Sequence, residues 1–434
     1  MKKNGSAILL SCFALLVLVL AGCGQGGRQV SKGPVSLTLW MNQAPAMNAA
    51  YQGLVEEYQK AHPQVTIKMQ TFEYDTFIQN LQTAFPSGSE SDIIMMFGTW
   101  VKSYSDYLST VPSSLISPAA AKSKFLSATL GGYLFDGKLY GIPQEFNIEY
   151  GAMLLNSQIA AEAGIDTGKP WKTWDDLIAD MKKTVKRDKG AMVRAGLGFC
   201  HKDGIAYTFL SLLRQYGGSP MNAEETAFSF DSEAGRKALL LMKRLVDEGL
   251  VDPVLFNETE NFASDAFFGG TMAGAIIGPW VIADYAKDFP DMVKLATYVP
   301  LPSIGPKPDF AAASGWGLVV SKKSPAQAAA WDVVKFIALD PKNAMRWNVE
   351  TATLPAQVEN TRSPAVDPLL VRYPYLATHI GLIPYGKYQG HMPDSDKVVY
   401  DILYEAIHKL LRGTATVEET LATIQAQSSE TLKK

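Results

Sequence analysis

The feature that most constrains the fold is a regular alternation of strand and helix patterns after residue 34. Residues 35–41 carry apolar side chains at every second position, which predicts a strand. Helical spacing over 46–61 and 75–85, and further strand patterns over 65–69 and 91–97, complete a strand-helix-strand-helix-strand order. This order is typical of a mostly parallel sheet covered by helices, so we expect an α/β protein.

Turn, cap and helix patterns continue through the rest of the chain. An Asp136-Gly137 pair between two apolar stretches predicts a hairpin, and Thr173 and Asp231 are expected to cap helices. The apolar spacing predicts further helices over 174–185, 206–216, 234–248, 325–339, 400–411 and 417–432. With 434 residues, the chain is long enough for two or three domains.

The amino terminus is predicted to be an export signal. Two lysines precede an apolar run over 7–20, which is too short to span a bilayer comfortably as a helix. The sequence LAGC at 20–23 resembles the bacterial lipobox, in which the cysteine is acylated and becomes the new amino terminus. We therefore expect a removable signal peptide over 1–22, a lipid on Cys23 and a flexible, glycine-rich tether over 23–33. The alternative is an ordinary secretory signal with an incidental cysteine.

Composition excludes several classes of protein. Removing the two signal-peptide lysines changes the net charge from −3 to about −5, and no basic block offers a surface for nucleic acid. Besides Cys23, the exported chain keeps only Cys200, which cannot form a disulfide within the chain and is expected to be a small buried hydrophobe. The fold must then depend on its core, for which the 47% apolar content is sufficient. The five histidines are scattered, without metal-ligand spacing.

Signatures of catalysis are incomplete. Residues 132–138 match most of a phosphate-binding loop, but Leu139 lacks the hydroxyl that would bind magnesium. The nucleophile-elbow pattern Gly-x-Ser-x-Gly does not occur. The carboxylate pairs that a glycosidase would need are Glu145 with Glu149, and Glu258 with Glu260. Nothing in the sequence requires catalysis, so we expect a protein that is not an enzyme and uses no cofactor or metal.

A series of short motifs follows from residue 136 onward. They are DGKLYGIP at 136–143, MLLN at 153–156, AGI at 163–165, WKTWDDL at 171–177, FFGGTMA at 267–273, GPW at 278–280, SGWGL at 314–318, the helix over 329–337 and LPA at 354–356. In this order, and behind a lipobox, they resemble the extracellular solute-binding proteins of carbohydrate ABC importers, the maltose-binding-like family 1. The resemblance covers nearly the whole exported chain.

That resemblance implies a periplasmic-binding-protein fold, in which two α/β lobes are joined by three crossings and close over a ligand by hinge motion. It places the crossings near 144–147, 275–278 and 312–315. The implied lobes are 34–144 plus 278–312 for lobe 1, and 145–277 plus 313–434 for lobe 2. It also implies a monomer that is anchored at the cell envelope by its lipid and delivers a small solute to the membrane permease.

The residues near these crossings suit a sugar. A pyranose has apolar C–H faces and a hydroxyl rim, which match aromatic side chains and groups that both donate and accept hydrogen bonds. The candidate ligand-binding residues are Trp40, Asn42, Glu73, Tyr74, Trp100, Glu145, Asn147, Trp280, Gly315 and Trp316. The alternative for each aromatic residue is burial in the core.

The charges of the candidate residues also indicate which charge the ligand carries. These residues include no lysine or arginine, so a neutral, hydroxylated ligand is favoured over glycerol phosphate or a glycerophosphodiester. The same fold binding such a phosphate remains an alternative within this class. A surface glycoside hydrolase is the alternative from another class, and an adhesion or sensory lipoprotein is a third.

The lipobox generates a direct prediction. Replacing Cys23 by Ala removes the thiol that would be acylated, so Cys23→Ala should release the protein from the membrane fraction and abolish labelling by a radioactive or clickable fatty acid. Cys200→Ala is the matched control and should stay in the membrane fraction. Unchanged membrane retention of Cys23→Ala would contradict the assignment.

Overall fold

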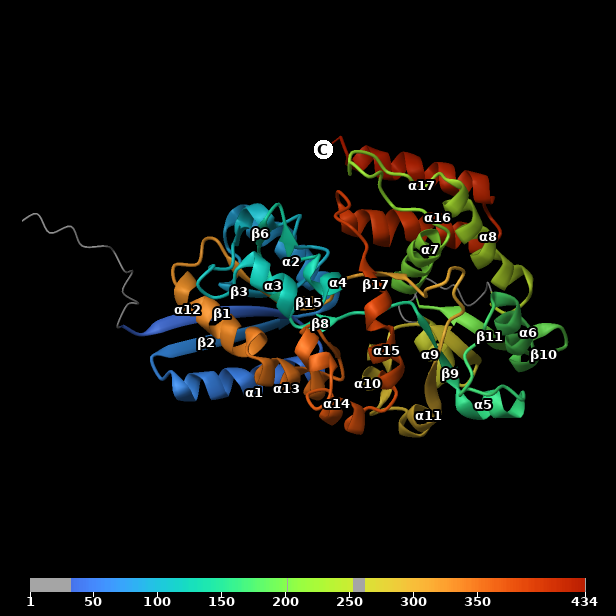
Figure 1. Cartoon of the computed structure of the whole chain (residues 1–434), viewed down its shortest axis with the longest axis horizontal. Coiled ribbons are helices and arrows are strands. Elements are labelled where there is room, and N and C mark those ends of the chain that lie inside the picture. Colours follow the sequence, from blue (N-terminus) through green and yellow to red (C-terminus); the bar gives the residue numbers. More distant parts are fainter. Residues whose placement is uncertain (1–32, 201, 253–261, 434) are drawn as a thin grey trace, which may run out of the picture. The chain divides into compact units, whose positions relative to one another are not determined.

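The computed structural model describes residues 33–200, 202–252 and 262–433. Two β-sheets organise them, each with helices packed around it (Figure 1). The first sheet has the order β2 (Val65–Phe72), β1 (Val35–Asn42), β3 (Ile93–Phe97), β15 (Trp316–Ser321) and β4 (Leu108–Ser109), and β7 (Gly141–Pro143) also pairs with β15. The second has the order β10 (Lys186–Asp188), β11 (Ala191–Phe199), β12 (Met272–Ile276), β9 (Ala152–Asn156) and β13 (Ala296–Pro300). The parts built on these sheets are called the first and the second lobe.

The predicted strand-helix alternation is confirmed in the first lobe. Strand β1 pairs in parallel with both β2 and β3, and its alternate residues Leu37, Leu39 and Met41 are fully buried. This alternation is what an amphipathic strand pattern dictates, because successive side chains point to opposite faces. Strand β15 joins β3 in the antiparallel direction, so the sheet is mixed at this side.

Helices and short elements complete the first lobe. They are α1 (Pro45–Ala61), α2 (Tyr74–Ser87), η1 (Ser105–Tyr107), α3 (Pro118–Lys124), α4 (Ser127–Leu130), the hairpin strands β5 (Leu134–Phe135) and β6 (Lys138–Leu139), β8 (Glu145–Phe146), α12 (Gln327–Val334), the π-helical η3 (Lys335–Leu339), α13 (Pro341–Thr351), β16 (Leu354–Pro355) and η4 (Val358–Thr361). The hairpin at Asp136-Gly137 is confirmed. Helix α2 begins at Tyr74, with Asp75 in its first turn, and it ends at Ser87, where Gly88 caps it in the left-handed conformation.

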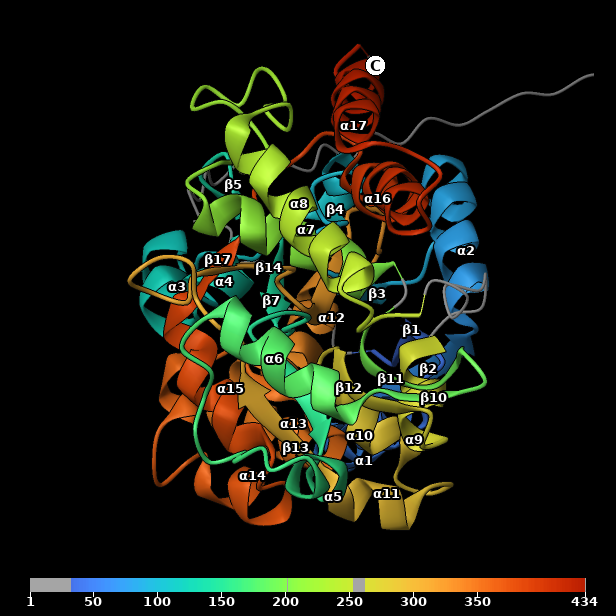
Figure 2. The ribbon, with the colours of Figure 1, turned by 90° about the vertical axis from the view of Figure 1, so that its right-hand side faces the viewer.

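The second lobe carries more helices. They are α5 (Ser157–Glu162), α6 (Trp174–Thr184), α7 (Asp203–Gln215), α8 (Glu233–Asp247), α9 (Phe262–Phe268), α10 (Trp280–Tyr285), α11 (Pro290–Leu295), α14 (Asp367–Arg372), α15 (Leu376–Leu382), η5 (Ile383–Tyr385), the π-helical η6 (Lys397–Leu403), α16 (Tyr404–Leu411) and α17 (Val417–Thr431). A small parallel pair, β14 (Phe310–Ala312) and β17 (Gly386–Tyr388), lies beside them. The last two helices pack with α7 and α8, as Figure 2 shows.

Helix capping follows the sequence in one case and departs from it in another. Thr173 forms a capping box with Asp176 at the start of α6, as predicted. At the start of α8 the cap is Ser232, whose hydroxyl accepts from the Gly235 N–H at 3.1 Å. The prediction that Asp231 fills this role is wrong by one residue, since both side chains are good caps and only the backbone conformation selects between them.

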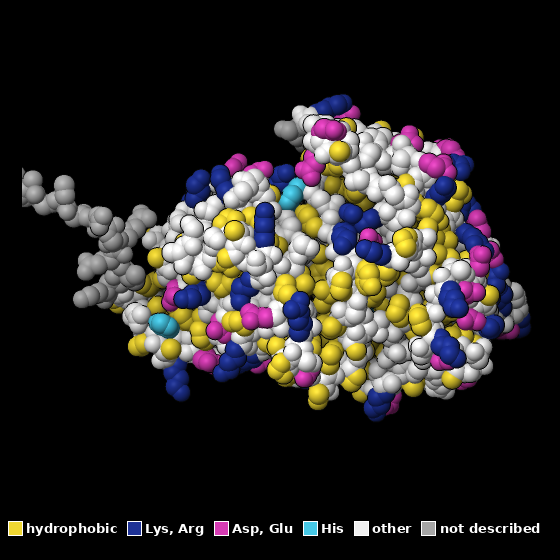
Figure 3. All heavy atoms as spheres, viewed as in Figure 1, with side chains coloured by type: hydrophobic (Ala, Val, Ile, Leu, Met, Phe, Trp, Pro, Cys, Tyr) yellow, Lys and Arg dark blue, Asp and Glu magenta, His cyan; other side chains and the backbone are white. Residues whose placement is uncertain are grey.

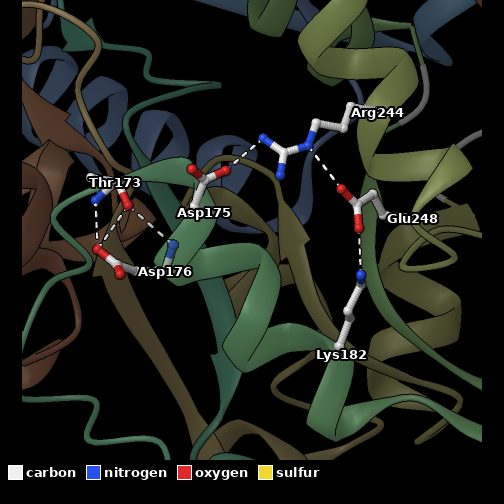
Figure 4. A network of polar contacts seen from close by, with 6 residues as sticks. All are labelled: Thr173, Asp175, Asp176, Lys182, Arg244 and Glu248. Atoms are coloured by element: carbon white, nitrogen blue, oxygen red, sulfur yellow. Dashed lines mark hydrogen bonds and ion pairs between the residues drawn. The ribbon is translucent and has the colours of Figure 1, made fainter.

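Ion pairs join helices α6 and α8 on the surface of the second lobe (Figure 4). The Arg244 guanidinium donates to Asp175 at 2.6 Å and to Glu248 at 2.9 Å, and Lys182 also pairs with Glu248. These groups are largely exposed, so solvent screens each ion pair and its contribution to stability is small. On the face in Figure 3, lysine and arginine are interspersed with aspartate and glutamate.

Strand pairing corrects the expected division of the chain into lobes. Segment 278–312 was expected in lobe 1, but its strand β13 pairs with β9 in the second sheet. Segment 313–434 was expected in lobe 2, but it opens with β15 in the first sheet. Residues 275–278 are therefore not a crossing. The chain passes between the lobes near 144–151, near 312–316, and between η4 and α15, because hydrogen bonding between distant strands decides which lobe each segment joins.

Several expectations concern residues outside this description. The signal peptide, Cys23 and most of the tether precede residue 33, and Glu258 and Glu260 fall within 253–261. Over the ranges described, no helix has the length and apolar content needed to cross a membrane. Cys200 is buried, as predicted.

The cysteine pattern predicts a fold that does not depend on disulfides. Thermal unfolding of the protein beginning at Ser31 should give the same melting temperature with and without a reductant, because Cys200 has no partner cysteine in that chain. A lower melting temperature under reduction, with the protein confirmed as a monomer, would contradict this reading.

Candidate functional site

A cleft lies where the two sheets and the crossing segments meet. Its inner chamber has a volume of about 310 Å³, and an outer chamber of about 520 Å³ shares the side chains of Tyr74 and Tyr400 with it. The inner chamber is lined from the first lobe by the ends of β1, β3 and β15, and from the second lobe by α7, α10 and η6. A concave space of this size, reached from both lobes, suits a small organic ligand.

The floor of the cleft is a junction of chain segments. The Gln144 N–H donates to Trp316 O at 2.9 Å, and the Asn147 N–H donates to Ser314 O at 3.0 Å, so the first and second crossings pair with each other. Strand β8 also pairs with β16, just before the chain returns to the second lobe. Gly315 has φ +140, and a Cβ there would lie 2.5 Å from Glu145 O, so this close approach requires glycine.

Glu145 is the buried acid of this junction. Its Oε1 accepts from the backbone N–H of Trp316 at 3.2 Å, and only 5% of its surface is exposed. Burial raises the pKa of its carboxyl to about 7, although the Trp316 N–H acts in the opposite direction. At neutral pH, Glu145 is therefore present in both its neutral and its ionised form.

Glu149 is a second buried acid, with a different environment. Its Oε1 accepts from Trp280 Nε1 and from Asn147 Nδ2, each at 2.9 Å, and its Oε2 accepts from the Gly278 N–H at 3.3 Å. Hydrogen bonds from several N–H donors compensate a carboxylate charge. Glu149 thus fixes the positions of two predicted site residues, Asn147 and Trp280.

A third carboxyl lies across the chamber on α10. Asp284 follows Trp280 by one helical turn, lines the inner chamber and is exposed to solvent. Protein atoms nevertheless displace much of the surrounding water, which raises the pKa of its carboxyl to about 6.

The structure brings most of the predicted site residues together. The inner chamber is lined by Asn42, Tyr74, Glu145, Asn147, Trp280 and Trp316. The outer chamber is lined by Tyr74 and Trp100. Trp316 packs edge-on against Phe97 and Trp100, with ring centroids 5.1 and 5.3 Å apart, so it belongs to both the core and the cleft wall. The ligand-binding roles of these residues remain predictions.

Three predicted residues do not line either chamber. Trp40 is half-buried and packs edge-on against Phe72 of β2, because it lies on the face of β1 opposite to the buried Leu39 and Met41. Glu73 is exposed at the position before α2. Gly315 lies behind the chamber wall, where it permits the close approach of the crossings.

Sequence reasoning missed other lining residues. Asp284 could have been found from its helical spacing to Trp280, but Tyr207 and Tyr400 lie in segments that carried no site signal. The loop at the end of α13 also lines the inner chamber, at 351–354. The charged residues of the outer chamber are Asp75, Lys202, Asp394, Asp396, Lys397 and Asp401.

Metal binding has no support in this cleft. Within the described ranges, no three His, Cys, Asp or Glu side chains gather in a way that could hold a metal ion.

The two lobes, their crossings and the cleft between them define a binding protein of the periplasmic type. The profile of the bacterial extracellular solute-binding protein family matches residues 44–344, and the chain belongs to this family. Similar proteins include an arabinooligosaccharide-binding protein of Bacillus subtilis, 24% identical over 336 residues, which are 74% of this chain and 73% of that protein. A maltotriose-binding protein of Pyrococcus abyssi is 22% identical over 417 residues, which are 90% of this chain and 82% of that protein.

Solved structures share the fold. The cyclic alpha-maltosyl-1,6-maltose binding protein from Arthrobacter globiformis has a TM-score of 0.76 at 23% identity, and the match covers 92% of this chain and 100% of that one. The expected two-lobed α/β fold is confirmed.

The environment of Glu145 predicts a pH-dependent stability. Its pKa is higher in the folded than in the unfolded chain, so its contribution is fully present below about pH 4 and is lost as pH rises through about 7. Glu145→Gln mimics the neutral carboxyl at every pH. The free energy of unfolding of the wild type, taken relative to Glu145→Gln, should fall by roughly 2 to 3 kcal/mol between pH 5 and pH 8.

Urea unfolding at both pH values measures this difference. Glu405→Gln, on the exposed side of α16, is the control, and its difference from the wild type should be the same at both pH values. An equal difference for Glu145→Gln at pH 5 and pH 8 would show that the buried carboxyl does not titrate in this window.

Proposed function

We propose that the chain is the substrate-binding protein of an ABC importer and that it captures an extracellular sugar by closing its lobes. The observation that carries the proposal is the composition of the inner chamber. Aromatic rings of Trp280 and Trp316 lie in its walls together with the polar groups of Glu145 and Asn147. This combination matches a pyranose, which offers apolar C–H faces to aromatic rings and a rim of hydroxyls to polar side chains.

The similar proteins support a sugar. Relatives that bind arabinooligosaccharide and maltotriose, and a fold neighbour that binds cyclic maltosyl-maltose, are all named for oligosaccharides. The two chambers, which share Tyr74 and Tyr400 in their walls, offer room for more than one sugar unit, which favours an oligosaccharide over a monosaccharide.

Charge argues against a phosphate ligand. The described residues that line the inner chamber include Glu145, Glu149 and Asp284 but no lysine, arginine or histidine. A phosphate or phosphodiester placed there would meet like charges and no cation. Glycerol phosphate and its diesters therefore have less support than a sugar.

Hydrolysis has less support than binding. Glu145 and Glu149 both line the inner chamber, as a glycosidase pair would. Glu149, however, already accepts hydrogen bonds from Trp280, Asn147 and Gly278, which hold it in place as a structural acceptor. Incubation with maltotriose and arabinotriose should release no new reducing ends.

The last step of the proposed function is delivery of the sugar to the importer in the membrane. The lipid on Cys23 would hold the protein at the cell envelope, on the outer side of the cytoplasmic membrane, and 23–33 would tether it there. The closed form would dock, as a monomer, on the transmembrane subunits of the importer.

The test combines binding and shape. Maltotriose and arabinotriose, and any solute seen by native mass spectrometry of the freshly purified protein, should raise the melting temperature and compact the molecule in small-angle scattering. Trp280→Ala should weaken binding of such a sugar by roughly 2 kcal/mol, about thirtyfold, because this partly exposed ring lines the chamber. It should also cost about 1 to 3 kcal/mol of stability, because the buried Glu149 carboxylate loses the hydrogen bond from Trp280 Nε1. Trp316→Ala should weaken binding and also cost about 3 kcal/mol of stability, because this ring packs in the core.

Phe289→Ala is the control. This aromatic side chain is 38% exposed and does not line the cleft, so its removal should leave sugar affinity unchanged. Normal sugar binding by both tryptophan variants would contradict the site, and failure of every sugar to bind or compact the protein would contradict the function.

A further inference from the structure

The charged side chains described in the lining of the inner chamber are all acidic. Its described lining residues include the carboxyl groups of Glu145, Glu149 and Asp284, without a lysine, arginine or histidine. The outer chamber is different, because Lys202 and Lys397 lie among its aspartates. The chamber that the crossing segments line is thus the one whose described lining has no positive side chain.

Two of the three inner carboxyls lack charge compensation. Glu149 accepts from three N–H donors, whereas the one donor to Glu145 is the Trp316 N–H at 3.2 Å. Loss of water raises the pKa of Glu145 to about 7 and that of Asp284 to about 6, and no cation acts on either. A carboxylate as deeply buried as that of Glu145 is costly unless a positive group pairs with it, whereas the exposed Asp284 adds a second negative charge to the same chamber.

The other polar and aromatic groups of the chamber also favour a donor. Asn42 lines it, and Asn42 Oδ1 is a buried acceptor with no hydrogen-bond partner among the described residues. Trp280 and Trp316 also line the chamber, and the face of an aromatic ring attracts a cation. An ammonium group supplies three donors, no acceptor and a positive charge, so it complements all of these features at once.

We propose that the sugar unit held in the inner chamber carries a protonated amino group, which pairs with Glu145 and Asp284. The proposal rests on the proposed function and narrows it to amino sugars. A hydroxyl also donates a hydrogen bond, but it brings no charge and leaves the two carboxyls uncompensated. The sequence favoured a neutral sugar because the candidate residues include no lysine or arginine. The structure shows in addition that the inner chamber has more hydrogen-bond acceptors than donors, which favours a ligand with a positive charge.

The closing experiment compares amino sugars with their hydroxyl counterparts by calorimetry and thermal shift at pH 7. The pairs are glucosamine with glucose, galactosamine with galactose, and the chitosan di- and trisaccharides with cellobiose and cellotriose. At least one amino sugar should bind about tenfold or more tightly than its partner, as expected for a charge-assisted contact.

Substitutions test whether the Asp284 carboxyl causes the preference for the amino sugar. Asp284→Asn keeps the size of the side chain and removes its charge, so it should abolish most of the preference for the amino sugar. Asp288→Asn is the matched control, because this exposed aspartate follows the same helix and does not line the chamber. It should retain the preference in full.

A pH series gives a second readout. Affinity for the amino sugar should fall about tenfold from pH 7.5 to pH 5.5, because protonation of Glu145 and Asp284 removes the charges that pair with it. The other titratable groups near these carboxyls include Glu149 and four tyrosines, and burial raises the pKa of each of the four. They are Tyr51, Tyr133, Tyr285 and Tyr375, which stay neutral throughout this range.

The outcomes separate the two proposals. Tight binding of a glucose, galactose or cello-oligosaccharide, with no gain for its amino partner, would overturn the amino-sugar inference and leave the sugar receptor standing. Failure of all these sugars, and of maltotriose and arabinotriose, would contradict both.

Discussion

The structure depends on the pairing of chain segments at the floor of the cleft. Backbone hydrogen bonds join Gln144 to Trp316 and Asn147 to Ser314, and β8 pairs with β16 beside them. Each of these segments leads from one lobe toward the other, so the lobes share one hydrogen-bonded junction. Gly315 is the residue that allows it, because a side chain there would collide with the first crossing. A junction of this kind holds the lobes together while leaving their outer parts free to approach each other.

Buried polar groups support the junction from behind. Tyr51 on α1 donates its hydroxyl hydrogen to the Gln144 side chain, and Asn348 on α13 donates to Gln144 O at 3.1 Å and to Thr353 at 3.0 Å. These bonds tie two helices of the first lobe to the crossing. Buried groups are costly when unpaired, so such a network fixes the crossing in one position. Glu145 is therefore presented to the cleft from a rigid base, as a precise binding site requires.

Three acids in one chamber differ because their surroundings differ. Glu149 has its charge balanced by N–H donors, Glu145 is deeply buried with one donor, and Asp284 is partly solvated on the opposite wall. The same residue type thus positions Asn147 and Trp280 in one case, and in the others it lines the chamber where we propose that the ligand binds. The proposed amino sugar follows from this unequal compensation, and the sum of charges alone would not have indicated it.

The sequence by itself determined the strand-helix alternation of the first lobe, the hairpin, the approximate boundaries of the helices that it predicted, and the crossing that carries Glu145 and Asn147. These are local properties, since periodicity, turn residues and caps act over a few positions. It also marked Trp280 and Trp316 through short motifs. Only the tertiary structure decided which lobe each later segment joins, because β13 and β15 select their sheets by hydrogen bonds to strands more than 100 residues away. It alone brought loop 351–354 and the tyrosines of α7 and η6 to the chamber, since contacts between distant segments leave no periodic trace in the sequence.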